Sequence, residues 1–196
     1  MKKIGITGGI GSGKTTVCLI FETLGIPVYY ADERAKWLMN HDKKLVAAIK
    51  ELFGSDAYTV EGELNRKYLA QLAFNDRSLL QRLNAIVHPA VIEDGERWFQ
   101  QQGHVPYALK EAALIYESGG YTQLDGVIVV TAPESLRIQR VVARDNSTEE
   151  EVAARINQQM PEAEKVARAD YVINNDGEHP LIPQVMAIHQ RLSAAL

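Results

Sequence analysis

Residues 8–15 of this 196-residue chain read Gly-Gly-Ile-Gly-Ser-Gly-Lys-Thr. The stretch matches the pattern G-x-x-x-x-G-K-[ST] at every fixed position, and this pattern is typical of loops that bind phosphate groups. Residues 3–7, directly before it, form a short β-branched run that predicts a buried strand, and residues 15–24 after it have the apolar period of a helix. The motif therefore stands in the strand-turn-helix context that a phosphate-binding loop requires.

The residue types of the loop indicate how it would hold a ligand. Glycines allow successive backbone N–H groups to approach phosphate oxygens, and the positive end of the following helix adds to the attraction. The ammonium of Lys14 would lie on the β- and γ-phosphates, while the hydroxyl of Thr15 would coordinate a bridging Mg2+ ion. The expected nucleotide ligands in this stretch are Gly9, Ile10, Gly11, Ser12, Gly13, Lys14, Thr15 and Thr16. The motif predicts a nucleoside triphosphate with Mg2+, but it does not indicate what happens to the phosphate.

The composition fits one compact α/β domain. Hydrophobic residues make up 46% of the chain and charged residues 23%, and no stretch approaches the length of a membrane span. A net charge of -4 argues against nucleic acid or an anionic membrane as a partner, because both need a concentrated basic surface. The lone cysteine, Cys18, is expected to be buried and inert in a reducing compartment, and the amino terminus carries no secretion signal. We therefore expect a soluble, cytoplasmic protein.

Short apolar segments that alternate with helical ones predict the fold. The expected strands are residues 3–7, 26–30, 105–110, 125–130 and 170–175. Residues 42–102 show no convincing β alternation and carry three apolar helical stripes, so we expect a helical insertion there. This alternation predicts an α/β fold built on a parallel sheet.

Asp32 follows the second expected strand. Ligands of open parallel sheets lie beyond the carboxyl ends of the strands, so Asp32 is placed to accept a hydrogen bond from an attacking hydroxyl and take its proton. An aspartate here can also simply cap the helix that follows it. Position alone does not separate a catalytic base from a helix cap.

The expected insertion contains two residues of interest. Pro89 interrupts its longest apolar period, and His88 stands immediately before the proline. A kink at Pro89 would aim His88 toward a ligand, whereas a boundary between two helices would make His88 an ordinary hydrogen-bonded side chain; spacing favours the boundary. Arg66 would pair with an anionic substrate or lie in solvent.

Three arginines follow the fourth expected strand, on a helix opened by Pro133. Arg137, Arg140 and Arg144 are three and four residues apart, which places their side chains near one helix face. Guanidinium groups suit phosphate oxygens, so a lid over the triphosphate is one interpretation, with Arg140 as its first candidate. The other is a charged surface paired with nearby glutamates. Residues 147–151 have capping-box spacing for the next helix, and a short helical hairpin suits a lid.

The end of the third expected strand departs from a common pattern. Many phosphate-loop proteins carry an aspartate there to hold the magnesium shell, but this chain has Lys110 and Glu111. Glu111 would contribute to that shell through water, or would be an ion-paired or solvated glutamate.

Taken together, these features resemble the phosphate-loop small-molecule kinases, and among them the dephospho-CoA kinase family. The resemblance covers nearly the whole chain, in family order and spacing. It is carried by residues 7–14, 31–32, 64–66, 87–89, 114–117, 139–140, 144–145 and 172–175. The combination of His88-Pro89 with the late Ile173-x-Asn175 is far more discriminating than the loop alone. The sequence departs from the commonest family pattern at residues 29–32 and 110–113. Neither departure touches the loop, Asp32 or the arginines, and the second concerns the magnesium shell and the acceptor contacts.

The resemblance implies a fold, a reaction and a division of labour. The fold is a single three-layer α/β/α kinase domain over residues 1–196, with a five-stranded parallel sheet. Its core covers about residues 1–31, 105–138 and 169–196. A helical insertion that binds the acceptor covers about residues 32–104, and a lid covers about residues 139–168. The reaction is transfer of the ATP γ-phosphate to the ribose 3′-hydroxyl of dephospho-CoA, the last step of coenzyme A synthesis. The implied catalytic residues are Asp32, which acts as the base, together with Lys14 and Arg140. ATP would also contact Asn174 or Asn175, with Asn175 preferred. The acceptor would contact Asp32, Arg66, His88 and Glu117.

Two other functions share parts of this pattern. Another nucleotide or metabolite kinase would have the same loop and lid but a different acceptor region. A guanine-nucleotide switch would need N-K-x-D and D-x-x-G elements, and the sequence contains neither. We expect small-molecule substrates, ATP and dephospho-CoA, with no nucleic acid or membrane partner, in a monomer or small homo-oligomer.

Overall fold

The chain forms two compact units. The computed structural model describes residues 1–75 and 77–194. One unit comprises Met1–Tyr29 with Gln101–Leu196 and is called the core unit below; the other, Tyr30–Gln100, is called the helical unit. None of the helices in the described ranges has the length and apolar character needed to cross a bilayer.

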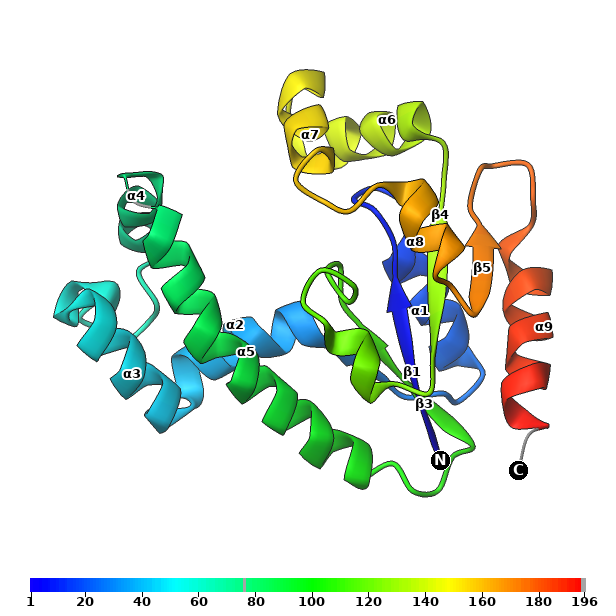
Figure 1. Ribbon diagram of the computed structural model, residues 1–196, viewed down its shortest axis with the longest axis horizontal. Coiled ribbons are helices and arrows are strands. Elements are labelled where there is room, and N and C mark those ends of the chain that lie inside the picture. Colours follow the sequence, from blue (N-terminus) through cyan, green and yellow to red (C-terminus); the bar gives the residue numbers. More distant parts are fainter. Residues whose placement is uncertain (76, 195–196) are drawn as a thin grey trace. The chain divides into compact units, whose positions relative to one another are not determined.

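A five-stranded sheet organises the core unit (Figure 1). The strands are β1 (Lys2–Thr7), β2 (Val28–Tyr30), β3 (Tyr107–Glu111), β4 (Gly126–Thr131) and β5 (Tyr171–Asn174). Their order is β2-β3-β1-β4-β5; β1 pairs in parallel with both β3 and β4, and β4 pairs in parallel with β5. The predicted parallel sheet is confirmed, and β1 lies at its centre, where both faces are covered.

Helices cover both faces of this sheet. The helices of the core unit are α1 (Lys14–Thr23), α6 (Glu134–Asp145), α7 (Glu149–Ile156), α8 (Glu162–Ala167) and α9 (Leu181–Ser193), with a short 3-10 helix at Gly120–Gln123. Of these, α1, α8 and α9 pack on the strands, while α6 packs on α7 beyond the end of β4 (Figure 1). Helices α1 and α9 contact one another, with α1 on β1 and β3 and α9 on β5. Ile115 and Tyr116 pack against Val127 and Val129 of β4, together with Val166 of α8. Because alternate residues of a strand face opposite sides, β4 contributes to both layers of the core.

The helical unit consists of α2 (Ala31–His41), α3 (Lys43–Phe53), α4 (Arg66–Asn75) and α5 (Arg77–Gln100), with a 3-10 turn at Ser55–Ala57. Helix α5 continues through Pro89, so the boundary between two helices that spacing favours is wrong. Val87 and Val91, on either side of the proline, are both buried. Packing of this apolar face keeps the helix intact where local preference alone would end it.

A buried ion pair fastens α8 to the core unit. The Lys165 ammonium lies 2.8 Å from Glu117 Oε1 and donates a hydrogen bond to the Ala113 carbonyl at 3.3 Å. Glu117 Oε1 also accepts a hydrogen bond from the Met160 N–H. Burial alone would raise the pKa of Glu117, but the hydrogen bonds from Lys165 and Met160 outweigh burial and lower it. The lysine side chain is 1% exposed and so depends on this one carboxylate.

We expect Glu117→Gln to destabilise the fold because it leaves the Lys165 charge buried without a counter-charge. Removing one partner of a buried pair lowers the free energy of unfolding by about 3–5 kcal/mol. Because Glu117 is partly exposed, we expect a loss of about 3 kcal/mol. Urea unfolding of the two chains measures this difference. The matched control is Glu164→Gln, which breaks the exposed pair with Arg168 and should cost less than about 1 kcal/mol.

The same comparison has a predictable pH dependence. Because folding lowers the pKa of Glu117 below its ordinary value of 4.5, the stability that it contributes is complete above that value. It is lost as the pH falls through the folded-state pKa. The difference between wild type and Glu117→Gln should therefore be full at neutral pH and shrink in acid; a pH-independent difference, or one no larger than that of Glu164→Gln, would contradict this account.

Candidate active site

The phosphate-binding loop joins the central strand to a helix, as the motif predicts. Strand β1 ends at Thr7 and α1 begins at Lys14. Gly11 and Gly13 have φ angles of 79° and 89°, a region that residues with a side chain rarely adopt. Lys14 folds back over the loop, and its ammonium donates to the Gly8 carbonyl at 2.9 Å. The loop is thus already formed around the amino terminus of α1, where backbone N–H groups attract anions.

Asn175 and Arg140 meet at this loop from distant parts of the chain. The Asn175 amide, directly after β5, donates to the Ser12 carbonyl at 2.7 Å. The Arg140 guanidinium of α6 donates to the Asn175 Oδ1 at 3.4 Å. Arg140 Nη1 and Ser12 Oγ are buried and have no hydrogen-bond partner in the described structure. The loop region therefore holds two polar groups that phosphate oxygens can satisfy.

The structure distinguishes the three arginines of α6. Arg137 is buried, and its Nη1 lies 2.9 Å from Glu162 Oε2, with its backbone packed against Gly11. Arg144 is exposed and forms an ion pair with its neighbour Asp145. Among the three, Arg140 is the one that hydrogen-bonds to Asn175 beside the loop. Within the described residues, the alternative, a charged surface paired with Glu134 and residues 149–151, holds only for Arg137, whose Nη2 lies 3.8 Å from Glu134 Oε2. The role of Arg140 at the triphosphate stays a prediction.

Sequence analysis missed two residues that connect the start of α8 to the loop and to the end of β4. Gln159 Oε1 accepts a hydrogen bond from the Ile10 N–H at 3.0 Å. Glu162, besides its contact with Arg137, accepts a hydrogen bond from the Ala132 N–H at 3.3 Å. The sequence near these residues offered only a weak indication: two polar side chains on either side of Pro161, at the start of a short helix. Contacts between segments that are 25 to 149 residues apart leave no periodic trace in the sequence.

The side chains beneath the loop bear on metal binding. Thr15 lies exposed in the first turn of α1, and Glu111 is a buried carboxylate at the end of β3, paired in register with Ile6 of β1. Burial raises the pKa of Cys18 in α1, and the negative charge of Glu111 raises it further. Cys18 is therefore the buried, inert thiol that was expected. Within residues 1–75 and 77–194, no three His, Cys, Asp or Glu side chains gather as a ready-made metal site.

The remaining predicted acceptor residues lie in the helical unit, except Glu117. Asp32 is exposed in the first turn of α2, whose N-cap is Tyr30, so the interpretation of Asp32 as a helix cap is wrong. Arg66 is the first residue of α4, and His88 lies on α5; both are exposed. Glu117 belongs to the core unit, where its Oε1 contacts the Lys165 ammonium and the Met160 N–H.

Comparisons with known proteins agree with this arrangement. The sequence profile of the dephospho-CoA kinase family matches residues 2–180. A dephospho-CoA kinase of Salinibacter ruber is 44% identical over 179 residues, which cover 90% of each chain, and one of Bacteroides fragilis is 39% identical over 186 residues, covering 95% of this chain and 90% of its own.

Solved structures show the same fold. A protein of Thermus thermophilus is 35% identical, with a TM-score of 0.84 over 100% of this chain and 98% of its own. The dephospho-CoA kinase of Campylobacter jejuni is 26% identical, with a TM-score of 0.73 over 98% of this chain and 97% of its own. On the family profile, these relatives and the loop described above, the chain belongs to the dephospho-CoA kinase family.

Proposed function

We propose that this chain transfers the γ-phosphoryl group of ATP to the ribose 3′-hydroxyl of dephospho-CoA, giving coenzyme A and ADP. The observation that carries the proposal is the preformed phosphate-binding loop in a chain that matches one kinase family over residues 2–180. The resemblance noted from the sequence is therefore supported by an independent profile match and by local geometry.

The core unit binds ATP in this proposal. Residues 9–16 hold the phosphates chiefly through backbone N–H groups, and the Ile10 N–H exchanges its bond to Gln159 Oε1 for a phosphate oxygen. Lys14 exchanges its bond to the Gly8 carbonyl for the β- and γ-phosphate oxygens. Arg140, which has an unsatisfied Nη1, stabilises charge on the moving phosphoryl group. Asn175 holds Arg140 and the loop in register, and residues 139–168 act as the lid that excludes water.

The helical unit binds the acceptor, as the insertion over residues 32–104 was expected to do. Asp32 hydrogen-bonds to the 3′-hydroxyl and takes its proton as the new P–O bond forms, while the bond from the γ-phosphorus to the bridging oxygen breaks and ADP leaves. Arg66 and His88, both exposed in this unit, contact the acceptor.

The residues around the loop fit a magnesium ion. A hydroxyl at Thr15 and a nearby buried carboxylate at Glu111 are oxygen donors of the kind that Mg2+ prefers. Thr15 would bind the ion directly and Glu111 would hold its water ligands, with the other ligands coming from the nucleotide. A bound Mg2+ would neutralise charge on the β- and γ-phosphates.

Product identification tests this function. ADP release with Mg-ATP should be measured with dephospho-CoA, adenosine, AMP and no acceptor, and the product identified by mass. Conversion of dephospho-CoA to coenzyme A well above the other acceptors is the expected result. Equal turnover of all acceptors, or none, would keep the nucleotide site and exclude this acceptor, which favours another metabolite kinase.

Asp32→Asn tests the proposed base. The amide keeps the size of the side chain but cannot take a proton, so kcat should fall by about 10²–10⁴-fold while ATP binding is unchanged. Steady-state kinetics and calorimetric ATP titration measure the two effects. Glu33→Gln, the neighbouring exposed carboxylate, is the control and should retain wild-type turnover; near-normal turnover of Asp32→Asn would exclude the base assignment.

Asn175→Ala tests the link between the loop and Arg140. Loss of the amide removes the hydrogen bonds to the Ser12 carbonyl and from Arg140. The KM for ATP should therefore rise roughly tenfold, which corresponds to a loss of about 1–1.5 kcal/mol of binding free energy. Asn174→Ala is the matched control because the hydrogen bonds that residue 174 makes with Gln184 use its backbone. An equal effect of the two variants would show that Asn175 has no special role at the loop.

A further inference from the structure

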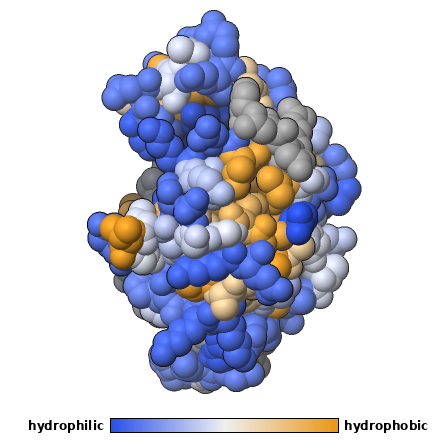
Figure 2. Space-filling model, turned by 90° about the vertical axis from the view of Figure 1, so that its left-hand side faces the viewer, coloured by the Kyte–Doolittle hydropathy of each residue, from blue (hydrophilic) through white to orange (hydrophobic). Residues whose placement is uncertain are grey.

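The helical unit contains an apolar pocket that the proposed catalytic residues leave unused. Its volume is about 310 Å³, which is at the lower end of the range for small-molecule sites. It is lined by Lys36, Met39, Phe53, Leu64, Arg66, Leu69, Ala70, Leu79, Leu80 and Leu83. Figure 2, which looks at the side of the molecule where α3 and α4 lie, shows an apolar patch bordered by hydrophilic side chains.

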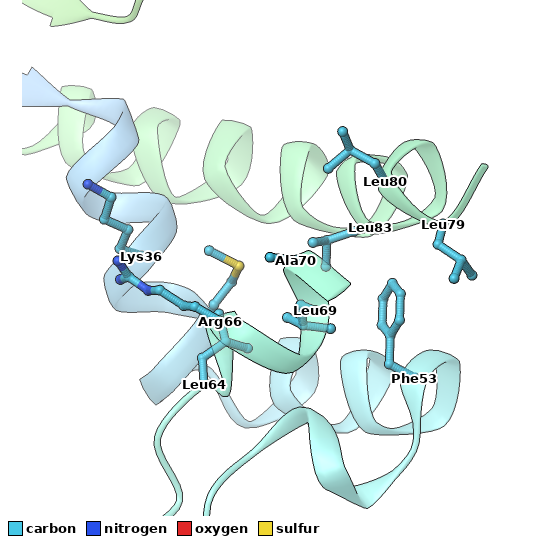
Figure 3. Close-up of a pocket in the computed structure, with 10 residues that line it drawn as sticks. Lys36, Phe53, Leu64, Arg66, Leu69, Ala70, Leu79, Leu80 and Leu83 are labelled. Atoms are coloured by element: carbon cyan, nitrogen blue, oxygen red, sulfur yellow. The ribbon is translucent and has the colours of Figure 1, made fainter. Parts of the chain in front are cut away.

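Two cations stand at one end of this pocket. In Figure 3 the charged ends of Lys36 and Arg66 lie on the same side, away from Phe53 and from Leu79, Leu80 and Leu83. Both side chains are exposed, and neither forms an ion pair with a carboxylate in the described parts of the chain. The pocket therefore combines an apolar cavity with two unpaired positive charges, which suits an amphiphilic molecule that carries phosphate at one point.

Hydrogen bonds hold the chain segments that carry these two cations next to one another. The Leu64 N–H donates to Asn40 Oδ1 at 2.7 Å, and the Tyr58 hydroxyl donates to the Met39 carbonyl at 2.6 Å. Burial raises the pKa of Tyr58 to about 12, so its hydroxyl remains a donor at neutral pH. These bonds tie the segment before α4 to the last turns of α2. Arg66, at the start of α4, is thereby held beside the helix that carries Lys36.

Helix α2 connects the pocket to the proposed base. Asp32, Lys36 and Met39 are four and three residues apart, so they lie along one face of the helix. Another face of α2 is held against α5 by Arg34, whose guanidinium donates two hydrogen bonds to the Asp94 carboxylate, at 2.9 and 3.0 Å. About one helical turn, ~5.4 Å along the axis, separates the backbone positions of Asp32 and Lys36. Beyond Lys36, Met39 enters the wall of the pocket.

We infer that this face of α2 aligns dephospho-CoA: Lys36 and Arg66 bind its pyrophosphate, and the apolar pocket takes its pantetheine arm. The inference rests on the proposed function and assigns the acceptor's parts. In dephospho-CoA the pyrophosphate leaves the ribose at the 5′ position, only a few bonds from the 3′-hydroxyl, and the pantetheine arm continues beyond it. Hydroxyl, charge and arm therefore follow in the order carboxylate, cations and pocket. Charge complementarity favours this occupant over an uncharged apolar one.

Charge-removing variants provide the test. Lys36→Met and Arg66→Met keep much of the side-chain length, and each should raise the KM for dephospho-CoA by roughly tenfold or more while the KM for ATP is unchanged. Lys67→Met removes an exposed charge one residue from Arg66, outside the pocket lining, and is the matched control. A rise in the KM for ATP instead, or an equal effect of the control, would overturn the assignment of the two cations.

A direct binding measurement tests the pocket without relying on turnover. Pantetheine 4′-phosphate, which lacks the adenosine half, should bind the wild-type chain in calorimetry and compete with dephospho-CoA but not with ATP. Its affinity should fall roughly tenfold in Lys36→Met and in Ala70→Phe, which fills the pocket from α4. No binding, or binding that both variants retain, would overturn the inference even if the wild type makes coenzyme A. Failure of the wild type to phosphorylate dephospho-CoA would instead reject the proposed function.

Discussion

The hydrogen bond from the Asn175 amide to the Ser12 carbonyl is the contact on which the nucleotide site depends. It joins the end of β5 to the loop after β1, two strands that are separated in the sheet by β4. The loop must hold Gly13 at positive φ so that α1 can begin with its N–H groups directed into the loop. Asn175 secures that turn and at the same time accepts a hydrogen bond from Arg140. One side chain thus couples the phosphate-binding main chain to the lid arginine.

Two buried ion pairs hold α8 within the core unit. Arg137 with Glu162 and Lys165 with Glu117 each have a nearly inaccessible cation, and they join α8 to α6 and to the segment after β3. Such pairs add little net stability over apolar packing, but losing one partner is costly. Beside these pairs, Arg140 Nη1 and Ser12 Oγ are buried without a hydrogen-bond partner in the described structure.

The sequence predicted what local patterns encode. Five strands, the loop and the capping box at Thr148, which pairs with Glu151, are confirmed because each depends on residues close together in the chain. The helix boundary at Pro89 was wrong because tertiary packing outweighs the local cost of proline. Gln159, Lys165 and Lys36 were missed because their contacts or their pocket arise from distant segments. The catalytic role of Asp32 and the acceptor contacts of Arg66, His88 and Glu117 remain predictions.

The central claim is that each unit binds one substrate, and hydrogen–deuterium exchange on the full chain tests it most directly. A non-hydrolysable ATP analogue with Mg2+ should slow exchange in residues 8–16 and around Asn175. Dephospho-CoA alone should slow exchange in α2 and at the start of α4, within the helical unit. Protection of the loop by dephospho-CoA, or of α2 and α4 by the nucleotide alone, would contradict this division of the two substrates.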